Sequence, residues 1–271
     1  MPVTTNAFAT VIELTLVLAG VLLIRQVALS SRARATTSVS PLPPWDAPLS
    51  DFLLFLWLAI SGGLIGPIVA QLSLRLLSLG EESKLIFVNS GFQGGMLAGV
   101  ALYYGLVNRR APRPVFRFAS AFLSGGTTFL VSLPLIVVVG LAWVGLLKLC
   151  GLPVEPQDAV SIFKKAKSPG LIGAMVVLAA LLAPLTEELI FRAGIFRYVR
   201  TRLPRWAALL APACCFAAVH NHLPSFAPLV ALGIVFSLAY ERTGWIGTPI
   251  IAHALFNSYS IVRIFIDPNA S

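Results

Sequence analysis

Charged residues are scarce in this chain. Only 11% of its 271 residues are Asp, Glu, Lys or Arg, and 57% are hydrophobic. A soluble domain carries about 25% charged residues. Long apolar runs separated by short basic segments are typical of a polytopic membrane protein, so we expect no separate soluble domain.

Cysteine is also rare. The three residues Cys150, Cys214 and Cys215 show no metal-binding or redox spacing, and the adjacent pair lies in an apolar run, where small packing residues are expected. The chain has no His-Glu-x-x-His sequence, which excludes the usual helix of a zinc protease. No basic segment precedes the first apolar run, so we do not expect a signal peptide.

The net charge of +9 does not indicate nucleic-acid binding, because the basic residues lie in short segments between apolar runs. In such segments Lys and Arg set the topology of a membrane protein and mark the cytoplasmic side. Both termini are therefore expected outside the cytoplasm. Short loops and the missing targeting signal favour a prokaryotic plasma membrane. The two strongest clusters are Arg109, Arg110, Arg113 and Arg117, and Arg197, Arg200, Arg202 and Arg205.

The apolar runs predict an all-α fold of about eight transmembrane helices in a single membrane domain. Residues 1–170 are expected to form four N-terminal spans, and residues 171–266 the four spans of a catalytic core. The expected spans cover about residues 8–24, 52–74, 85–107, 118–147, 171–196, 206–222, 226–240 and 246–266.

Three segments outside or within these spans have a recognisable composition. Residues 35–50 are rich in Ser, Thr and Pro and are expected to be a cytoplasmic linker. Residues 151–170 are expected to be an outer loop with a short interfacial helix, although the three lysines there favour the other side. In the third span, glycines four residues apart are expected to permit close helix packing: Gly91, Gly95 and Gly99.

One apolar run contains three ionisable residues within six positions: Glu187, Glu188 and Arg192. Charge at membrane depth is costly, so these residues predict a functional site. Glu188 and Arg192 are four residues apart and are expected to pair on one helix face. Glu187 points about 100° away around the helix, which leaves its carboxylate free for chemistry. Pro184 is expected to kink the helix near this site.

Histidines in later apolar runs supply partners for these charges. His253 and Asn257 are four residues apart and share a helix face, and His220 ends another run. At about 1.5 Å per residue, these groups and Glu187 reach compatible depths between mid-membrane and the cytoplasmic third. His222 lies beside a predicted helix end and is expected to be interfacial rather than catalytic.

The polar groups fit more than one kind of chemistry. A carboxylate beside an imidazole can deprotonate water, and a second His with an Asn amide can stabilise an oxyanion, which together hydrolyse an amide bond. Glu187, His220 and His253 could instead bind Zn²⁺ and leave a position for water. The cluster could also be a proton or ligand site in a transporter or helix-binding scaffold. The residues alone do not decide between a metal-free site and a zinc site.

The chain contains three motifs in this order: Glu187-Glu188-x-x-x-Arg192, Phe216-x-x-x-His220 and His253-x-x-x-Asn257. Together they resemble the motifs of the CPBP family, which comprises type II CAAX prenyl endopeptidases and Abi-like intramembrane proteases. The resemblance covers about residues 171–262. It implies an intramembrane endopeptidase that cuts a membrane-associated protein or peptide near the cytoplasmic side. One departure is Ala193, at a position often Gly in the family, which we expect to matter little.

The resemblance also implies a role for each matched residue. Glu187 would activate water together with His220 and without a metal ion, so the resemblance implies no cofactor, with zinc as the alternative. His253 and Asn257 would stabilise the oxyanion. The remaining two motif residues would support the site: Glu188 and Arg192.

Overall fold

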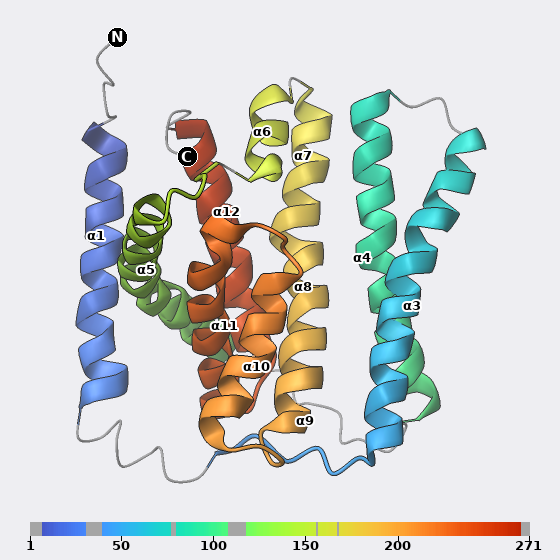
Figure 1. Cartoon of the computed structure of the whole chain (residues 1–271), viewed down its shortest axis with the longest axis horizontal. Helices are drawn as coiled ribbons and strands as arrows, with labels where there is room; N and C mark the ends of the chain where they lie inside the picture. The colour runs from blue at the N-terminus through green and yellow to red at the C-terminus, as the bar shows by residue number, and fades with distance from the viewer. Residues whose placement is uncertain are drawn as a thin grey trace.

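The computed structural model describes residues 7–30, 40–76, 80–107, 118–155, 157–166 and 168–266. These residues form a bundle of helices without a β-strand, which confirms the predicted all-α class. Seven of the described helices are long and apolar enough to cross a membrane, as expected for a multi-pass membrane protein. They run roughly side by side in Figure 1.

The first half of the chain contains four long helices, at positions close to the predicted spans. They are α1 (Ala7–Ile24), α3 (Leu49–Ser73), α4 (Glu81–Leu106) and α5 (Phe118–Leu149). A π-helical turn extends α1, and a 3₁₀ turn extends α3. Helix α1 packs mainly on α5, whereas α3 and α4 pack chiefly on each other and lie at one side of the bundle (Figure 1).

Glycines bring the backbones of α3 and α4 into direct contact. A Cβ atom built on Gly66 would overlap the carbonyl oxygen of Gly91, and one on Gly95 would overlap that of Gly62. The prediction of close packing through the glycine face of the third span is therefore confirmed.

The second half begins with a short helix and a long, irregular one. The predicted span at residues 171–196 is part of a continuous helix, Pro169–Val199, in which two π-helical segments interrupt the α-helical ones. Such π-segments frequently mark functional sites. Its parts are α7 (Pro169–Val177), η4 (Leu178–Leu182), α8 (Ala183–Glu188), η5 (Leu189–Phe196) and α9 (Arg197–Val199). The other helices are α6 (Asp158–Lys165), α10 (Arg205–Ala218), α11 (Leu223–Thr243) and α12 (Gly247–Ile266).

One predicted span is shorter than expected. The sequence predicted a helix over residues 206–222, but α10 ends at Ala218 and has 14 residues. At about 1.5 Å per residue it measures about 21 Å, less than the roughly 30 Å hydrocarbon core of a bilayer. The helix ends because the chain turns through Asn221, whose φ of 47° is left-handed. Seven helices, rather than eight, are thus long enough to span in the described part of the chain.

Residues 40–48 do more than connect α1 to α3. The side chains of Leu42 and Trp45 are buried. Three arginines that follow η5 donate hydrogen bonds to backbone carbonyls of this segment: Arg197 to Pro43 at 3.1 Å, Arg200 to Leu42 at 2.8 Å and Arg202 to Ala47 at 2.8 Å. We call residues 40–48 the strap. The prediction of a simple linker over residues 35–50 is corrected there, while residues 31–39, with Arg32 and Arg34, lie outside the described residues.

The two ends of the bundle differ in charge. We call the end with α9 and the start of α10 the arginine-rich end, and the end with α6 the opposite end (Figure 1). The described start of α1 and the last residue of α12 both lie at the opposite end. Which end faces the cytoplasm stays a prediction. Arg109, Arg110, Arg113 and Arg117, between α4 and α5, lie outside the described residues.

Candidate active site

A buried ion pair lies at the centre of the second half of the chain. Arg192 Nη1 donates to Glu188 Oε1 at 2.8 Å, and the two side chains are 1% and 0% exposed. The predicted pairing is confirmed. The same carboxylate oxygen accepts a hydrogen bond from His253 Nδ1 of α12, also at 2.8 Å. Sequence reasoning missed this second role, in which Glu188 orients a histidine from another helix.

Aromatic rings surround the Arg192 guanidinium. Its central carbon lies 4.4 Å from the ring centre of Phe216 and 5.4 Å from that of Phe236, distances that favour cation–π attraction. On α11, a Cβ atom at Gly233 would lie 2.9 Å from Ala213 Cβ and 3.3 Å from Arg192 Nη2, so this glycine lets α11 pack closely against both residues. The ion pair is thus held in place by packing on two helices as well as by its own hydrogen bond.

Glu187 presents its carboxylate to a cavity. Its Oε2 lies 3.8 Å from His253 Nε2, and the side chain is 17% exposed. It makes no hydrogen bond to any side chain or backbone group in the described ranges, unlike Glu188 next to it. The prediction that the two adjacent carboxylates face different surroundings agrees with this geometry.

Both histidines of the cluster have a fixed ring orientation. His220 Nδ1 lies 2.7 Å from the carbonyl oxygen of Phe216, one helical turn earlier. Because a carbonyl oxygen only accepts, Nδ1 carries the proton and Nε2 of the neutral ring is an acceptor. The Phe216 ring lies edge-on to both imidazoles, 4.9 Å from His220 and 5.8 Å from His253 between ring centres. The Phe216 ring therefore contacts both imidazole rings and helps to fix their positions relative to each other.

Asn257 ties α12 to the helix that carries the carboxylates. Its Nδ2 donates to the carbonyl oxygen of Ala179 at 2.8 Å. In this π-helical segment the backbone N–H of Ala183 bonds to Leu178. The next residue, Pro184, has no N–H to offer Ala179. Pro184 and the π-segment together leave that carbonyl to Asn257.

A cavity of about 390 Å³ brings the four predicted catalytic residues together. Its walls are mostly apolar side chains, joined by a few hydroxyl and amide groups. The polar lining residues are Gln157, Glu187, His220, Ser225, His253, Asn257 and Ser260.

His222 takes no part in this lining. Its Nδ1 lies 2.8 Å from Ser225 Oγ, and its Nε2 lies 2.9 Å from the carbonyl oxygen of Glu155. It therefore links the turn after α10 to the loop before α6. Its expected place at the membrane interface stays a prediction.

A zinc ion would need at least three ligand side chains around one point. In the part of the chain that the structure describes, no group of three or more His, Cys, Asp or Glu side chains has a geometry that could hold a metal ion. Both cavity histidines use Nδ1 for protein oxygens, which leaves Nε2 of each ring available, as in histidines that bind metals. The zinc alternative therefore stays a prediction, and no step below uses a metal ion.

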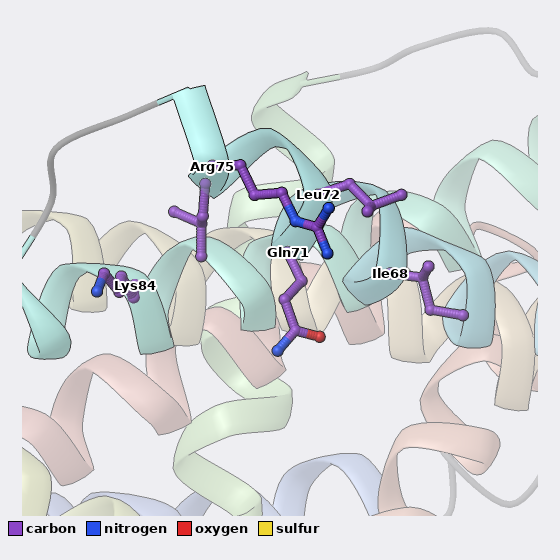
Figure 2. Close-up of a pocket in the computed structure, with 6 residues that line it drawn as sticks. Ile68, Gln71, Leu72, Arg75 and Lys84 are labelled. Atoms are coloured by element: carbon purple, nitrogen blue, oxygen red, sulfur yellow. The ribbon is translucent and has the colours of Figure 1, made fainter.

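Two other cavities lie along α3 and α4. One, of about 570 Å³, is lined by Gln71, Arg75, Lys84 and three aliphatic residues, as Figure 2 shows. The second, of about 810 Å³, lies over the glycine face. Neither cavity has a carboxylate or an imidazole in its described lining, so neither offers the groups needed for amide hydrolysis.

Comparison with known proteins points to one family. The sequence model of the family described as type II CAAX prenyl endopeptidase Rce1-like matches residues 169–259. Over 126 residues the chain is 28% identical to the "Membrane-embedded CAAX protease MroQ" of Staphylococcus aureus, which covers 44% of this chain and 49% of the relative. No solved structure matches the chain significantly.

Two further relatives differ in how much of them is matched. The "Putative membrane peptidase YdiL" of Bacillus subtilis is 31% identical over 88 residues, which cover 32% of this chain and 36% of the relative. An uncharacterized 24.3 kDa protein of Escherichia coli is 30% identical over 184 residues, covering 64% of this chain and 82% of the relative. The chain thus spans half or less of the relatives whose names describe a peptidase.

Proposed function

We propose that this chain, which belongs to the CPBP family of type II CAAX prenyl endopeptidase-like membrane proteases, hydrolyses a peptide bond in a membrane-associated protein or peptide. One observation carries the proposal. A carboxylate without a hydrogen-bond partner among the described residues, two oriented histidines and an asparagine line one largely apolar cavity.

Glu187 is the general base in this mechanism. Its carboxylate lines the cavity together with His220 and His253, and its Oε2 lies 3.8 Å from His253 Nε2. His220, with its proton on Nδ1, offers Nε2 as an acceptor for the second hydrogen of a water molecule. The water oxygen attacks the carbonyl carbon of the substrate while one of its protons moves to Glu187.

His253 and Asn257 stabilise the oxyanion that forms. Glu188 holds the Nδ1 proton of His253, so a donor at Nε2 requires the imidazolium form. The two carboxylates, the guanidinium and this imidazolium then sum to zero net charge, which suits a buried cluster. The Asn257 Nδ2 group carries two hydrogens, one for Ala179 and one for the oxyanion.

The tetrahedral intermediate then collapses. The carbon–nitrogen bond breaks, and the proton held by Glu187 passes to the leaving nitrogen. The products are a carboxylic acid and an amine, which become a carboxylate and an ammonium group when the acid proton moves to the amine, so atoms and charge balance without any further reactant. Glu188 and Arg192 touch no reacting atom in this scheme and act by positioning His253 and the helix around it.

The test compares two intramembrane carboxylates. New peptide termini in the membrane fraction are identified by mass spectrometry from cells with the wild-type chain, Glu187→Gln or Glu13→Gln. Glu13 serves as the matched control, because its carboxylate pairs with Arg263 instead of lining the cavity. We expect the termini to disappear in Glu187→Gln and to persist in Glu13→Gln. Termini retained by a normally expressed Glu187→Gln variant would contradict the proposal.

Metal dependence is tested separately on the purified wild-type protein. If the reaction runs through Glu187 and the two histidines alone, activity persists after extensive treatment with a zinc chelator. Activity that is lost on chelation and restored by added Zn²⁺ would replace this mechanism with a zinc-dependent one.

A further inference from the structure

A cavity of about 570 Å³ lies where α3 ends and α4 begins. It shares no lining residue with the catalytic cavity. Gln71 lies in the last turns of α3, Arg75 in the 3₁₀ turn that extends it, and Lys84 in the first turn of α4 (Figure 2). Two cations and an amide therefore line one cavity. The rest of its described lining is aliphatic: Ile68, Leu72 and Leu74.

Helices α3 and α4 diverge toward this cavity. Their backbones touch at Gly66 and Gly91. A proline inside a helix removes a backbone hydrogen bond and bends the helix, and Pro67 follows Gly66 directly. Beyond this point α3 leans away from α4 in Figure 1, so that their joined ends stand apart. Lys84 lies seven residues before Gly91, on the same face of α4, and therefore extends toward the space between these ends.

Both cations lie at the ends of apolar spans. Arg75 is next to the last residue of the span Leu49–Leu76, and Lys84 is the second residue of the span Ser83–Leu106. In a bilayer, Arg and Lys at such positions keep their charges among the lipid headgroups while their aliphatic stems lie against apolar surface. Because both leaflets contain phospholipid, this placement holds whichever end of the bundle faces the cytoplasm.

The polar groups of the cavity match the oxygens of a phosphate. The Arg75 side chain makes no ion pair or hydrogen bond with any group in the described ranges, so its guanidinium can bind two phosphate oxygens at once. Lys84 donates to Glu81 at 2.6 Å and keeps two further N–H donors. The Gln71 amide adds another donor. Because Glu81 offsets the charge of Lys84, the site favours the phosphate group itself rather than negative charge in general.

We propose that this cavity binds a glycerophospholipid. The phosphodiester group lies against Gln71, Arg75 and Lys84. An acyl chain follows Ile68 and Leu72, whose side chains are 57% and 52% exposed. Such a lipid fills the space between the diverging ends of α3 and α4 and stabilises the pair there, independently of the proposed hydrolysis. Phosphate and acyl chains are both required, because the cavity joins cationic groups to an apolar surface.

Titrations of the purified full chain separate these contributions. The delipidated protein in detergent is titrated with phosphatidylglycerol or with dioleoylglycerol, which lacks the phosphate, and native mass spectrometry measures the bound lipid. Inorganic phosphate serves as the competitor. Arg75→Gln removes the guanidinium. Lys148→Gln is the matched control, because Lys148 is an exposed cation that lines none of the three cavities described above.

We expect Arg75→Gln to bind phosphatidylglycerol about tenfold more weakly than the wild type, and Lys148→Gln to bind it equally well. Dioleoylglycerol should bind the wild type and Arg75→Gln with the same affinity. Equal affinities of all three proteins for phosphatidylglycerol would overturn the proposal. Displacement of the bound lipid by equimolar inorganic phosphate would also overturn it and would indicate a site for free phosphate.

Discussion

The α3–α4 pair and the α8–α12 region solve the same packing problem in different ways. In α3 and α4, glycines let backbones touch, and a Cβ atom at Gly62, Gly66 or Gly95 would overlap a carbonyl oxygen of the facing helix. Between α12 and the helix Pro169–Val199, contact is made by polar groups: His253 bonds to Glu188, which also pairs with Arg192 on its own helix, and Asn257 bonds to Ala179.

The difference teaches where function can reside in such a bundle. Inside a bilayer, helices gain little from the hydrophobic effect and associate by close packing or by polar contacts. Glycine contacts hold helices together but offer no reactive group. Polar contacts cost desolvation and give groups that can move protons. Five variants would break or sharpen this comparison.

Arg192→Leu should have the largest effect. It leaves the Glu188 carboxylate buried without its cation, and breaking a buried pair in this way costs about 3–5 kcal/mol. We expect a large fall in the thermal unfolding temperature of the detergent-solubilised protein and loss of activity. An unfolding temperature equal to that of the wild type would mean that the Glu188–Arg192 pair does not stabilise the fold.

The double variant Glu188→Leu/Arg192→Leu separates stability from chemistry. Replacing both partners of a buried pair by apolar residues is often neutral or stabilising. We expect thermal stability to recover relative to Arg192→Leu, whereas activity stays lost because His253 has no anchor. Recovered activity in the double variant would exclude a positioning role for Glu188.

Gly95→Ala probes the other region. The added methyl group would overlap the Gly62 carbonyl, and overpacking of this kind costs about 1–3 kcal/mol. Gly94→Ala is the matched control, because a Cβ atom there meets nothing within 4 Å. We expect Gly95→Ala to lower the unfolding temperature without changing activity per folded molecule. An equal effect of both substitutions would contradict packing by backbone contact.

Asn257→Leu should cost about as much, 1–3 kcal/mol, because it leaves the Ala179 carbonyl without its donor. In a Pro184→Ala background, residue 184 regains an N–H that can reach Ala179 in the π-helical register. We therefore expect Asn257→Leu to destabilise the protein less in that background. A double-mutant cycle of thermal unfolding measures this coupling. Additive effects would show that Pro184 does not free this carbonyl.

Glu13→Gln should have the smallest effect. The Glu13–Arg263 pair is 3.3 Å apart, and its side chains are 33% and 46% exposed. The pair lies outside the cavity, and Gln keeps the size and the hydrogen-bonding capacity of Glu. We expect almost unchanged unfolding and activity, measured on the same preparations. A loss as large as that of Arg192→Leu would place Glu13 in the functional network.

Several features of the site were predictable because they are local. The pairing of Glu188 with Arg192 follows from the helical period, since residues four apart lie on one face. The free carboxylate of Glu187 follows from the same period. The hydrogen bond of Glu188 to His253 and that of Asn257 to Ala179 join helices 65 and 78 residues apart in the chain, and no local pattern specifies them. The catalytic roles of these residues stay a prediction.

The sequence by itself determined the all-α membrane class and the approximate positions of the long helices, and it predicted which residues form the site. It could do so because hydropathy and helical periodicity act over one or a few turns. Only the tertiary structure decided that α10 stops at Ala218, that three arginines hold the strap and that the predicted catalytic residues line one cavity. These features depend on how separate helices cross and pack, which is set by distant contacts rather than by neighbouring residues.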